Sequence, residues 1–335
     1  MGLQIGDIVP RKQIRLEELK GKVVAIDAFN ALYQFLSSIR QPDGTPLMDS
    51  KGRVTSHLSG LFYRNMSLLS EGIKLVYVFD GSPHELKRRT HELREEAKQR
   101  MLEKYEEARD EGDVEMMGRY AKADSKLSEE MIEESKELLQ ALGIAVVQAP
   151  SEGEMQCAQL VKEGQAYAVG SQDYDALVVG AKRLIQNLTL ARKRKTMNGF
   201  VYISPELIEY EHVLNTLGIN ADQLICLAIL VGTDFNPGGV KGIGQKKALE
   251  LVKRKKYPVE IFKEVEERLD FNWQDVFEIF KKPNVAHVEL EFPKLNEERI
   301  LEILVREHDF SEERVRKQLE KLRERKKQNA QQTLL

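Results

Sequence analysis

Short apolar runs, rich in β-branched residues, recur through the first half of the chain. They are VVAID at 23–27, KLVYVFD at 74–80, IAVVQA at 144–149 and AYAVGS at 166–171. Continuous runs of this kind are typical of parallel strands buried on both faces. Stretches with helical character separate them, at about 29–40, 56–71, 128–142 and 154–163. The alternation predicts an α/β fold, a parallel sheet flanked by helices, to which 177–180 and 200–203 could add strands.

Two regions depart from this alternation. Residues 82–126 are dense in Glu, Lys and Arg and have few apolar anchors. They predict charged helices, either a solvated face held by i,i+4 pairs or a mobile helical arch that closes over a charged ligand. From about residue 220 onward we expect helices throughout, with a charged helix at 312–327 and a disordered tail at 328–335.

A glycine-rich turn joins two of the later helices. The turn NPGGVKGIG, which contains Gly239, Gly242 and Gly244, leads into a basic helix that begins QKKAL. Backbone N–H groups at the start of such a helix suit a phosphate, and Lys246 and Lys247 could reach neighbouring backbone oxygens. An ordinary pair of antiparallel helices would explain the same text.

Composition sets bounds on the class of protein. The chain has 335 residues, 41% of them hydrophobic and 31% charged, and its net charge of −3 excludes a simple polycation. Cys157 and Cys226 both lie in apolar helical text, which predicts reduced, buried thiols and an intracellular protein. We see neither a signal peptide nor a run of about 20 apolar residues, so we expect no membrane association.

Acidic residues follow the apolar runs repeatedly. They are Asp27, Asp80, Glu152, Glu154, Asp173, Asp175 and Asp234. Open α/β folds place their sites at the carboxyl edge of the parallel strands, so we expect these acids to share one pocket. Close carboxylates repel one another, and divalent metals relieve that repulsion. Ligands that are all oxygen favour Mg²⁺ or Mn²⁺ over zinc, which indicates a metal-dependent hydrolase of phosphate esters.

Each acid also has a purely structural explanation. Asp27 could cap the following helix, and Ser151 with Glu154 could form a capping box. Asp80 could belong to a turn with Gly81, and Asp234 could initiate the turn at 236–237. Capping, however, predicts no preference for one edge of a sheet. Pairs such as 152/154 and 173/175 could instead share two metal ions about 4 Å apart.

Five motifs, in chain order, closely resemble the flap endonuclease family in its archaeal form. They are VVAIDAFNALYQFL, VYVFDGSP, APSEGEMQCAQL, GSQDYDALVVG and ILVGTDFN followed by GVKGIGQKKAL. The resemblance implies a PIN-like α/β core, a helical arch, a C-terminal helix–hairpin–helix region, two Mg²⁺ ions (replaceable by Mn²⁺) and cleavage of 5′ flaps on branched DNA. It divides the chain into an N-terminal nuclease region (1–98), an internal nuclease region (116–258, with the hairpin at about 221–253), a helical region (259–327) and the tail.

The same resemblance assigns roles to individual residues. The seven acids match the metal ligands of the family, with Asp80, Glu152, Glu154 and Asp173 nearest the metals. Lys87 and Arg94, seven residues apart at the arch base, match the cations that face the scissile phosphate. Tyr33 matches a base-stacking tyrosine, Gly2 the glycine near the site, and the hairpin glycines with Lys246 and Lys247 the duplex contacts.

Two departures from the family pattern stand out. His84 occupies a position where relatives commonly carry a second proline after the Asp80 turn. The tail has Gln331 and Leu334 of the peptide that binds the sliding clamp (PCNA), but it lacks the paired aromatic residues that follow. Either the tail has been shortened or clamp binding is weak.

Overall, the sequence predicts a monomeric, Mg²⁺-dependent 5′ flap endonuclease of the cytoplasm or nucleoid of an archaeon. Two alternatives stay open. One is a sibling 5′ exonuclease or bubble-cutting nuclease, and the other is a junction-binding module without catalysis.

Overall fold

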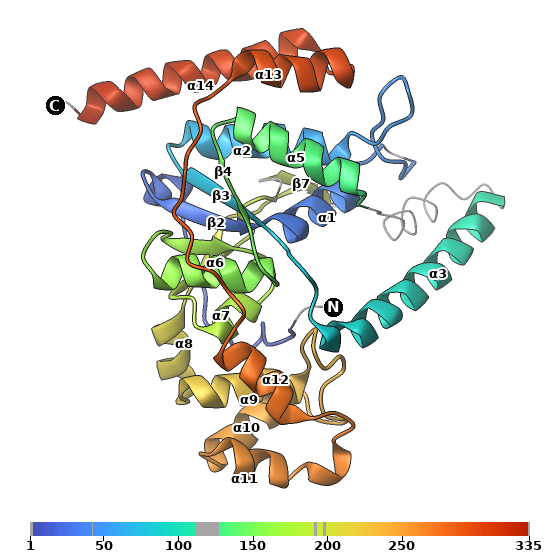
Figure 1. The fold of residues 1–335 in the computed structure, drawn as a ribbon, viewed down its shortest axis with the longest axis vertical. Coiled ribbons are helices and arrows are strands. Elements are labelled where there is room, and N and C mark those ends of the chain that lie inside the picture. The colour runs from blue at the N-terminus through green and yellow to red at the C-terminus, as the bar shows by residue number, and fades with distance from the viewer. Residues whose placement is uncertain (1–2, 42, 111–126, 191–192, 197–198, 334–335) are drawn as a thin grey trace.

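A computed structural model describes residues 3–41, 43–110, 127–190, 193–196 and 199–333 of the chain. At its centre is a seven-stranded sheet in the order β1-β9-β6-β5-β2-β3-β4 (Figure 1). The strands in chain order are β1 (Lys12–Gln13), β2 (Val23–Asp27), β3 (Lys74–Phe79), β4 (Ala145–Gln148), β5 (Ala168–Gly170), β6 (Arg183–Gln186) and β9 (Glu206–Glu209).

Strands β4, β3, β2, β5 and β6 run parallel to one another, which confirms the predicted parallel sheet. Strand β9 joins β6 in the antiparallel sense, and β1 joins β9 in the same way. The sequence analysis expected a strand at 177–180, and this prediction is wrong, because those residues lie in and directly after the short helix α7 (Asp175–Val179). The run at 200–203 does lie largely in a strand, β8 (Gly199–Tyr202), which pairs with β7 (Lys193–Thr196) outside the main sheet.

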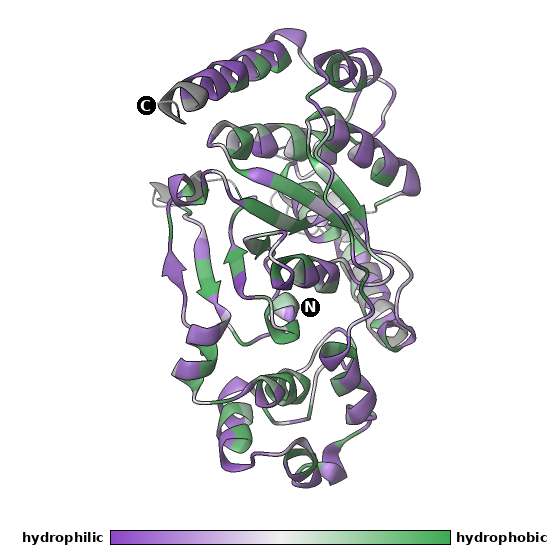
Figure 2. Ribbon diagram, turned by 60° about the vertical axis from the view of Figure 1, so that its left-hand side comes forward, coloured by the Kyte–Doolittle hydropathy of each residue, from purple (hydrophilic) through white to green (hydrophobic). Residues whose placement is uncertain are grey.

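Both faces of the sheet are buried because apolar side chains project from each. On β3, Leu75, Tyr77 and Phe79 pack into one core cluster, whereas Val76 and Val78 pack into the other. Figure 2 shows the central strands as predominantly hydrophobic, with hydrophilic residues on the outlying helices. This double burial explains why these strands appear in the sequence as continuous apolar runs.

Helices cover the two faces. The face that carries Tyr77 packs on α1 (Ala28–Ser38), α2 (Ser56–Ser70) and α5 (Glu129–Ala141). The opposite face packs on α6 (Gly153–Lys162) and α7, with α9 (Ala221–Val231) behind them. The predicted helices at 29–40, 56–71, 128–142 and 154–163 correspond to α1, α2, α5 and α6.

The charged region 82–126 begins with the 3-10 helix η2 (Glu85–Lys87), which continues into α3 (Arg88–Asp110). Figure 1 shows α3 extending outward from the body of the protein, which agrees with its scarcity of apolar residues. The remaining part of the predicted arch, 111–126, lies outside the described residues.

The second half of the chain forms two helical groups at opposite ends of the protein (Figure 1). One group holds α8 (Tyr210–Leu217), α9, α10 (Gln245–Arg254), α11 (Pro258–Lys263), the 3-10 helix η4 (Glu266–Arg268) and α12 (Trp273–Lys281). The other holds α13 (Glu297–Leu301), the π-helix η5 (Glu302–Glu307) and α14 (Glu312–Thr333). No single helix of the described ranges is long and apolar enough to span a membrane; α8 and α9 pass that test only as a pair that bends by 80°.

An extended strap at 283–296 connects the two groups, so the prediction of helices throughout this half is wrong at that point (Figure 1). Two prolines, Pro283 and Pro293, bound most of the strap, and proline disfavours helix interiors. The buried side chain of Gln156 holds the strap through two hydrogen bonds to the backbone of Ala286, both 2.8 Å long.

The C-terminal group is fixed to the body by a set of charged side chains that we call the histidine cluster: Asp49, Arg53, His57, Glu134 and His308. His308 lies 3.1 Å from Asp49 through Nδ1 and 3.1 Å from Glu134 through Nε2. The Arg53 Nε donates to Asp49 over 2.8 Å, and His57 Nε2 lies 3.7 Å from Glu134. The cluster therefore connects η5 to α2, α5 and the turn before α2.

Candidate metal and DNA site at the carboxyl edge of the sheet

The seven predicted acids come together at the carboxyl edge of the parallel strands. Asp27 is the last residue of β2, Asp80 directly follows β3, and the remaining acids lie in the segments after β4 and β5 or after α9. Each acid is electrostatically coupled to at least two others; Asp175, for example, interacts with Asp173 and Asp234. The structure therefore brings the seven acids to one edge of the sheet, where the sequence analysis placed them.

Asp27 has both of the roles considered for it. Its Oδ1 accepts a hydrogen bond of 3.1 Å from the backbone N–H of Asn30 and so caps α1. The same side chain is buried among the other acids. Burial, followed by repulsion from Asp80, raises the pKa of Asp27 to about 8.

Asp80 is held by the start of α6. The backbone N–H of Gly153 donates to Asp80 Oδ1 over 2.8 Å. A Cβ at position 153 would come within 2.6 Å of that oxygen, so only glycine allows this approach. Burial and the neighbouring Glu152 raise the pKa of Asp80.

The capping-box explanation for Glu154 is wrong. Helix α6 has Glu152 as its N-cap, and Ser151 instead donates to the carbonyl of Ser82 over 3.1 Å. Glu154 points into the acidic pocket, where its Oε1 is buried and accepts no hydrogen bond from the described residues. Burial, followed by repulsion from Asp173 and Asp175, raises the pKa of Glu154 well above its usual range.

Asp173 and Asp175 follow β5 on either side of the buried Tyr174. Asp173 Oδ2 accepts a hydrogen bond of 2.8 Å from Asn30 Nδ2, and Asp175 starts α7. Asp175 Oδ1 is buried and accepts no hydrogen bond from the described residues, and burial with repulsion from Asp234 raises the pKa of this acid to about 7.

Asp234 lies in the loop after α9, but it does not initiate the turn there. Thr233 and Asn236 close that turn: the Thr233 hydroxyl donates to Asn236 Oδ1 over 2.7 Å, and Asn236 Nδ2 donates to the carbonyl of Ile229 over 2.8 Å. The carboxylate of Asp234 is thereby left to face the pocket, where it interacts with Asp80 and Asp175.

Lys87 supplies positive charge to this pocket from the arch base. Its Nζ contacts Glu152 directly and lies 4.0 Å from Asp234. Burial alone lowers the pKa of Lys87, but Glu152, Asp234 and Asp80 outweigh it, so the pKa is raised and the ammonium stays charged. Arg94, the second predicted cation, lies on α3, whereas Lys87 is the last residue of η2. The side chain of Arg94 lies outside the described part of the protein.

These side chains fit divalent cations chemically. Every donor is a carboxylate oxygen, two buried oxygens accept no hydrogen bond from the described residues, and burial followed by repulsion between the acids raises several of their pKa values. In the arrangement observed, the described residues form no group of three or more His, Cys, Asp or Glu side chains set to hold one ion. Lys87 instead supplies the counter-charge to Glu152, the role that a cation would otherwise fill.

The three glycines of the hairpin before α10 differ in whether the backbone conformation and packing require a glycine at that position. Gly239 has φ +57°, and a Cβ there would come within 2.4 Å of the Leu230 carbonyl oxygen. Gly242 also has a positive φ, of +80°. Gly244, the N-cap of α10, has φ −91°, and a Cβ there would meet nothing within 4 Å. Backbone strain and packing therefore explain Gly239, whereas neither requires a glycine at 244.

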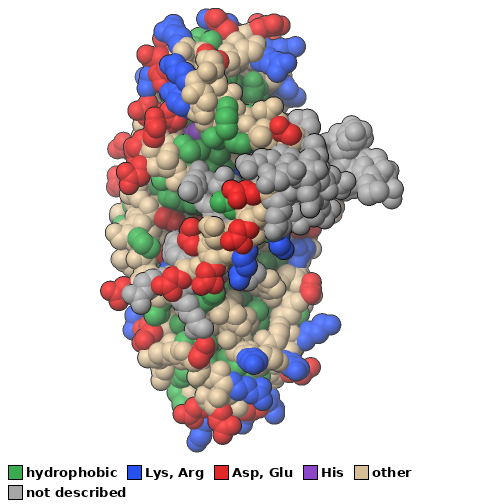
Figure 3. All heavy atoms as spheres, turned by 90° about the vertical axis from the view of Figure 1, so that its right-hand side faces the viewer, with side chains coloured by type: hydrophobic (Ala, Val, Ile, Leu, Met, Phe, Trp, Pro, Cys, Tyr) green, Lys and Arg blue, Asp and Glu red, His purple; other side chains and the backbone are tan. Residues whose placement is uncertain are grey.

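The other residues predicted to contact DNA lie partly within and partly outside the described part of the chain. Tyr33 lies on α1 with 46% of its surface exposed, and Lys247 Nζ donates to the carbonyl of Gly242 over 3.3 Å, as expected. Figure 3 shows Lys and Arg side chains near the base of the arch and lower on the same face, with acidic side chains between them. Gly2, Leu334 and the side chain of Gln331 lie outside the described part of the chain.

Sequence reasoning missed three residues that organise this edge. Asn30 bridges Asp27 and Asp173, Thr90 donates to the backbone carbonyl of Asp234, and the Phe235 ring lies under the Lys87 ammonium. Only Asn30 had a local signal, because it lies three residues after an acid that ends a strand. The contacts of Thr90 and Phe235 join segments more than 140 residues apart.

Comparison with known proteins identifies the class. The XPG N-terminal domain matches residues 4–101, and the XPG I-region matches residues 143–234. Both describe XPG-type nucleases, which is the class that the fold and the acidic edge define. The chain belongs to the flap endonuclease 1 family.

Full-length similarities support that assignment. The chain is 52% identical over 337 residues to flap endonuclease 1 of Pyrococcus furiosus, covering 100% of this chain and 98% of the relative. Its fold is similar to flap endonuclease-1 from Methanococcus jannaschii, with a TM-score of 0.75, 44% identity and coverage of 96% and 98%. It is also similar to the catalytic core of Rad2 in complex with DNA substrate, with a TM-score of 0.70, 25% identity and coverage of 96% and 100%.

Proposed function

We infer that this protein is a structure-specific 5′ flap endonuclease, which hydrolyses a phosphodiester at the junction between single-stranded and double-stranded DNA. The carrying observation is the gathering of seven carboxylates at one sheet edge, with Lys87 of the arch base in contact with them. Relatives that share about half of its residues over their whole length are flap endonucleases. The protein is thus a metal-dependent nuclease that acts on branched DNA.

We further propose that two Mg²⁺ ions bind this edge and that Mn²⁺ can replace them. Asp80, Glu152, Glu154 and Asp173 would lie nearest the ions, with Asp27, Asp175 and Asp234 supporting them. Bound ions supply positive charge that stabilises the reacting phosphate and favours ionisation of the attacking water. The raised pKa values of Asp27 and Glu154 support this proposal, because they reflect burial and mutual repulsion of carboxylates, both of which a bound cation would offset.

The side chains of the protein have distinct tasks in this scheme. Lys87, together with Arg94, would offset the charge of the scissile phosphate as it approaches the acids. Lys87 already carries a full charge at this edge, because Glu152 and Asp234 favour its protonated form. On release of its contact with Glu152, the Lys87 ammonium would be available to the phosphate while it stays at the acidic edge.

Two further elements would hold the substrate. The start of α10 at Gly244, with Lys246 and Lys247 in its first turn, would bind backbone phosphates of the duplex through Gly239–Gly244. Exposed Tyr33 would stack on a base next to the cleavage site. The arch, 82–126, would admit a free 5′ strand and so select flap ends.

Finer points about partners rest on the sequence. We propose that the protein acts as a monomer in the cytoplasm or nucleoid of an archaeon, since its relatives are archaeal. We also propose that Gln331 and Leu334 belong to a peptide that binds the sliding clamp.

The test uses a 5′-labelled double-flap duplex with Mg²⁺, with Mn²⁺ and with EDTA. A single short product from the junction, formed only with metal, is the expected result. A ladder of mononucleotides would instead identify a 5′ exonuclease, preferential cutting of a bubble substrate a bubble nuclease, and binding without cleavage a junction-binding module.

A further inference from the structure

We propose that Phe235 is a positioning residue that holds the Lys87 ammonium at the acidic edge through the face of its ring. The proposal rests on the function proposed above for Lys87. The Lys87 Nζ lies 5.5 Å from the centroid of the Phe235 ring, within the range of a cation–π interaction. The same ammonium contacts Glu152 and approaches Asp234, so ring and carboxylates bound it on different sides.

The ring can position Lys87 because it is itself fixed. Phe235 is 4% exposed, and its ring packs nearly perpendicular to two others, Phe280 with centroids 5.5 Å apart at 87° and His84 with centroids 5.9 Å apart at 88°. Its backbone N–H donates to the Thr233 hydroxyl over 3.1 Å, inside the turn closed by Asn236. A ring fixed at this many points offers one defined surface to the cation.

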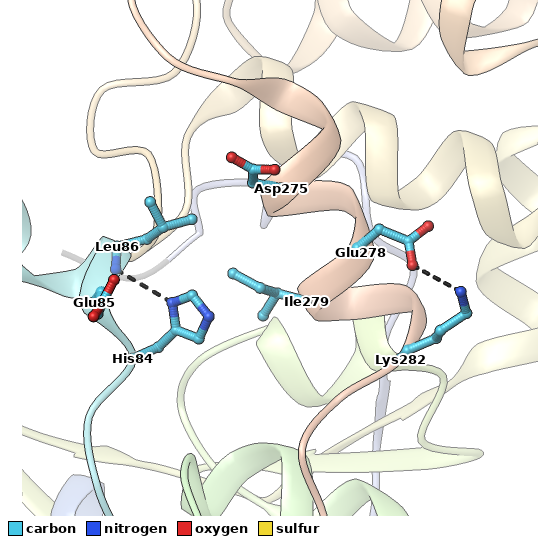
Figure 4. Close-up of a pocket in the computed structure, with 7 residues that line it drawn as sticks. All are labelled: His84, Glu85, Leu86, Asp275, Glu278, Ile279 and Lys282. Carbon is cyan, nitrogen blue, oxygen red and sulfur yellow. Dashed lines mark hydrogen bonds and ion pairs between the residues drawn. The ribbon is translucent and has the colours of Figure 1, made fainter.

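The arch base docks on the same short segment at three points. His84 packs on the Phe235 ring, Lys87 lies over its face, and the buried Thr90 donates to the carbonyl of Asp234. Residues 84, 87 and 90 are spaced by three, so they share one side of the turns that begin the arch. Figure 4 shows His84 at the margin of a pocket between the arch base and α12, facing Ile279.

An aromatic face suits this task better than another acid would. A carboxylate would hold the Lys87 ammonium by accepting hydrogen bonds from its N–H groups, and it would compete with the phosphate for those N–H groups. It would also add repulsion to an edge that already holds seven acids. A ring attracts the charge without accepting a hydrogen bond or adding a negative charge. Lys87 thus stays in place while its N–H groups can pass from Glu152 to the incoming phosphate.

The first experiment changes the electrons of the ring and keeps its shape. Phenylalanine at 235 is replaced by its 4-fluoro, 3,5-difluoro and 3,4,5-trifluoro derivatives, which progressively weaken the negative potential of the ring face. We expect the single-turnover cleavage rate of a saturating 5′ flap substrate in Mg²⁺ to fall stepwise, by about 10-fold across the series. Binding of the flap in EDTA should stay constant, and a flat series of rates would overturn the proposal.

A second experiment tests whether Phe235 acts through Lys87. Phe235→Leu should slow cleavage about 10-fold in the natural background and have no further effect when combined with Lys87→Ala. Phe235→Tyr, which keeps the ring, should retain most of the rate. Equal losses from Phe235→Leu with and without Lys87 would show a general packing role and contradict the proposal.

Phe62→Leu on α2 is the matched control, because Phe62 is a fully buried phenylalanine that packs in the core cluster on the other face of the sheet from Phe235. It should lower thermal stability and leave the cleavage rate of the folded enzyme unchanged. If the unmodified protein cleaves no flap at all, the proposed function fails before these variants are compared. If it cleaves and the variants do not differ, only the assignment of Phe235 fails.

Discussion

Two groups of acids in this protein, one buried and one partly buried, experience opposite electrostatic conditions. At the carboxyl edge of the sheet, burial and mutual repulsion raise the pKa of Asp27 to about 8 and of Asp175 to about 7. In the histidine cluster, the hydrogen bond with His308, followed by the nearby His57, lowers the pKa of Glu134 to about 2. Hydrogen bonds from Arg53 and His308 outweigh desolvation at Asp49 and lower its pKa to about 2 as well.

The difference lies in the number of partners and not in the kind of residue. Asp49 and Glu134 each accept hydrogen bonds from cationic or donor side chains, so these two acids stabilise the fold, although the buried ring nitrogens of His57 have no hydrogen-bond partner among the described residues. At the sheet edge, seven acids share Lys87, and two buried oxygens accept no hydrogen bond from the described residues. Repulsion at this edge lowers the stability of the protein when no ligand is bound, and a bound cation would relieve that repulsion. Functional sites commonly differ from structural ones in this way.

Asp175→Asn gives the largest expected effect. The change keeps the shape of the side chain but removes one charge from the edge, so flap cleavage in Mg²⁺ should fall by about 10³-fold or more. Without metal, the variant should unfold at a higher temperature than the natural protein, because repulsion with Asp173 and Asp234 is gone. Single-turnover rates and unfolding curves in EDTA measure the two effects.

Binding of flap DNA in EDTA serves as the control for Asp175→Asn and should stay within a few-fold of the natural protein. Cleavage at the natural rate would contradict the proposed metal site. An unfolding temperature lower than that of the natural protein would contradict the repulsion that we infer at this edge.

Glu134→Gln makes the equivalent change in the histidine cluster, and here we expect the stability of the protein to fall instead of rise. Loss of the carboxylate leaves His308 and His57 without their shared acid, so the free energy of unfolding should fall by about 2 kcal/mol. The cleavage rate of the folded enzyme should be unchanged, because Glu134 makes its ion pairs with His57 and His308 and with neither Lys87 nor the acids of the sheet edge. Denaturant unfolding at pH 6 measures the loss of stability. An increase in stability would contradict the proposed difference between the two groups of acids.

The pH dependence of stability separates the two regions further. In EDTA, the free energy of unfolding should fall as the pH rises from 5 to 8, because folded Asp27 and Asp175 retain protons that the unfolded chain has released. Saturating Mg²⁺ should remove most of this slope. Unfolding curves at several pH values, with and without Mg²⁺, measure it, and equal slopes in both conditions would contradict a cation site.

His308 contributes a second, metal-independent part to the same pH profile. Its pKa is raised chiefly by the hydrogen bond to Glu134, so its stabilisation is present below about pH 6.5 and disappears as the pH rises through its folded value. Glu134 acts at the other end, since its lowered pKa gives stability above about pH 4.5 that is lost as the pH falls toward 2. Glu134→Gln should remove the Glu134 contribution and much of the His308 contribution, because His308 keeps its contact with Asp49, and it should leave the Mg²⁺-sensitive slope intact.

The sequence revealed the acidic edge because its signal is local and repeated. Strands buried on both faces appear as apolar runs, and an acid at the end of each run marks the same edge. Strands β6 and β9 escaped prediction, since RLIQ and ELIE mix polar and apolar residues in only four positions. The apolar run at 177–180 was assigned to a strand because so short a run does not distinguish a strand from a buried helix.

The histidine cluster and the Phe235 contacts could not be predicted for a different reason. Asp49 and His308 are separated by 259 residues, and Thr90 and Asp234 by 144. No spacing rule connects side chains that only the folded topology brings together. The sequence therefore predicts the parts of the site that end strands, and the structure adds the residues that hold those parts in position.

Gly244→Ala is expected to have the smallest effect and extends the comparison to the hairpin. Gly244 has an ordinary φ and open space around its Cβ position, so alanine should leave the unfolding temperature nearly unchanged. If the N–H groups at the start of α10 bind a phosphate, the added methyl group would obstruct that approach and weaken duplex binding about 3- to 10-fold, which fluorescence anisotropy measures. Gly239→Ala, placed at φ +57° and against the Leu230 carbonyl, should instead destabilise the fold, which separates a glycine required by packing from one required by a ligand. If Gly244→Ala leaves the affinity for duplex DNA unchanged, this turn does not contact DNA. The acidic edge would then be the region whose residues are explained by a ligand.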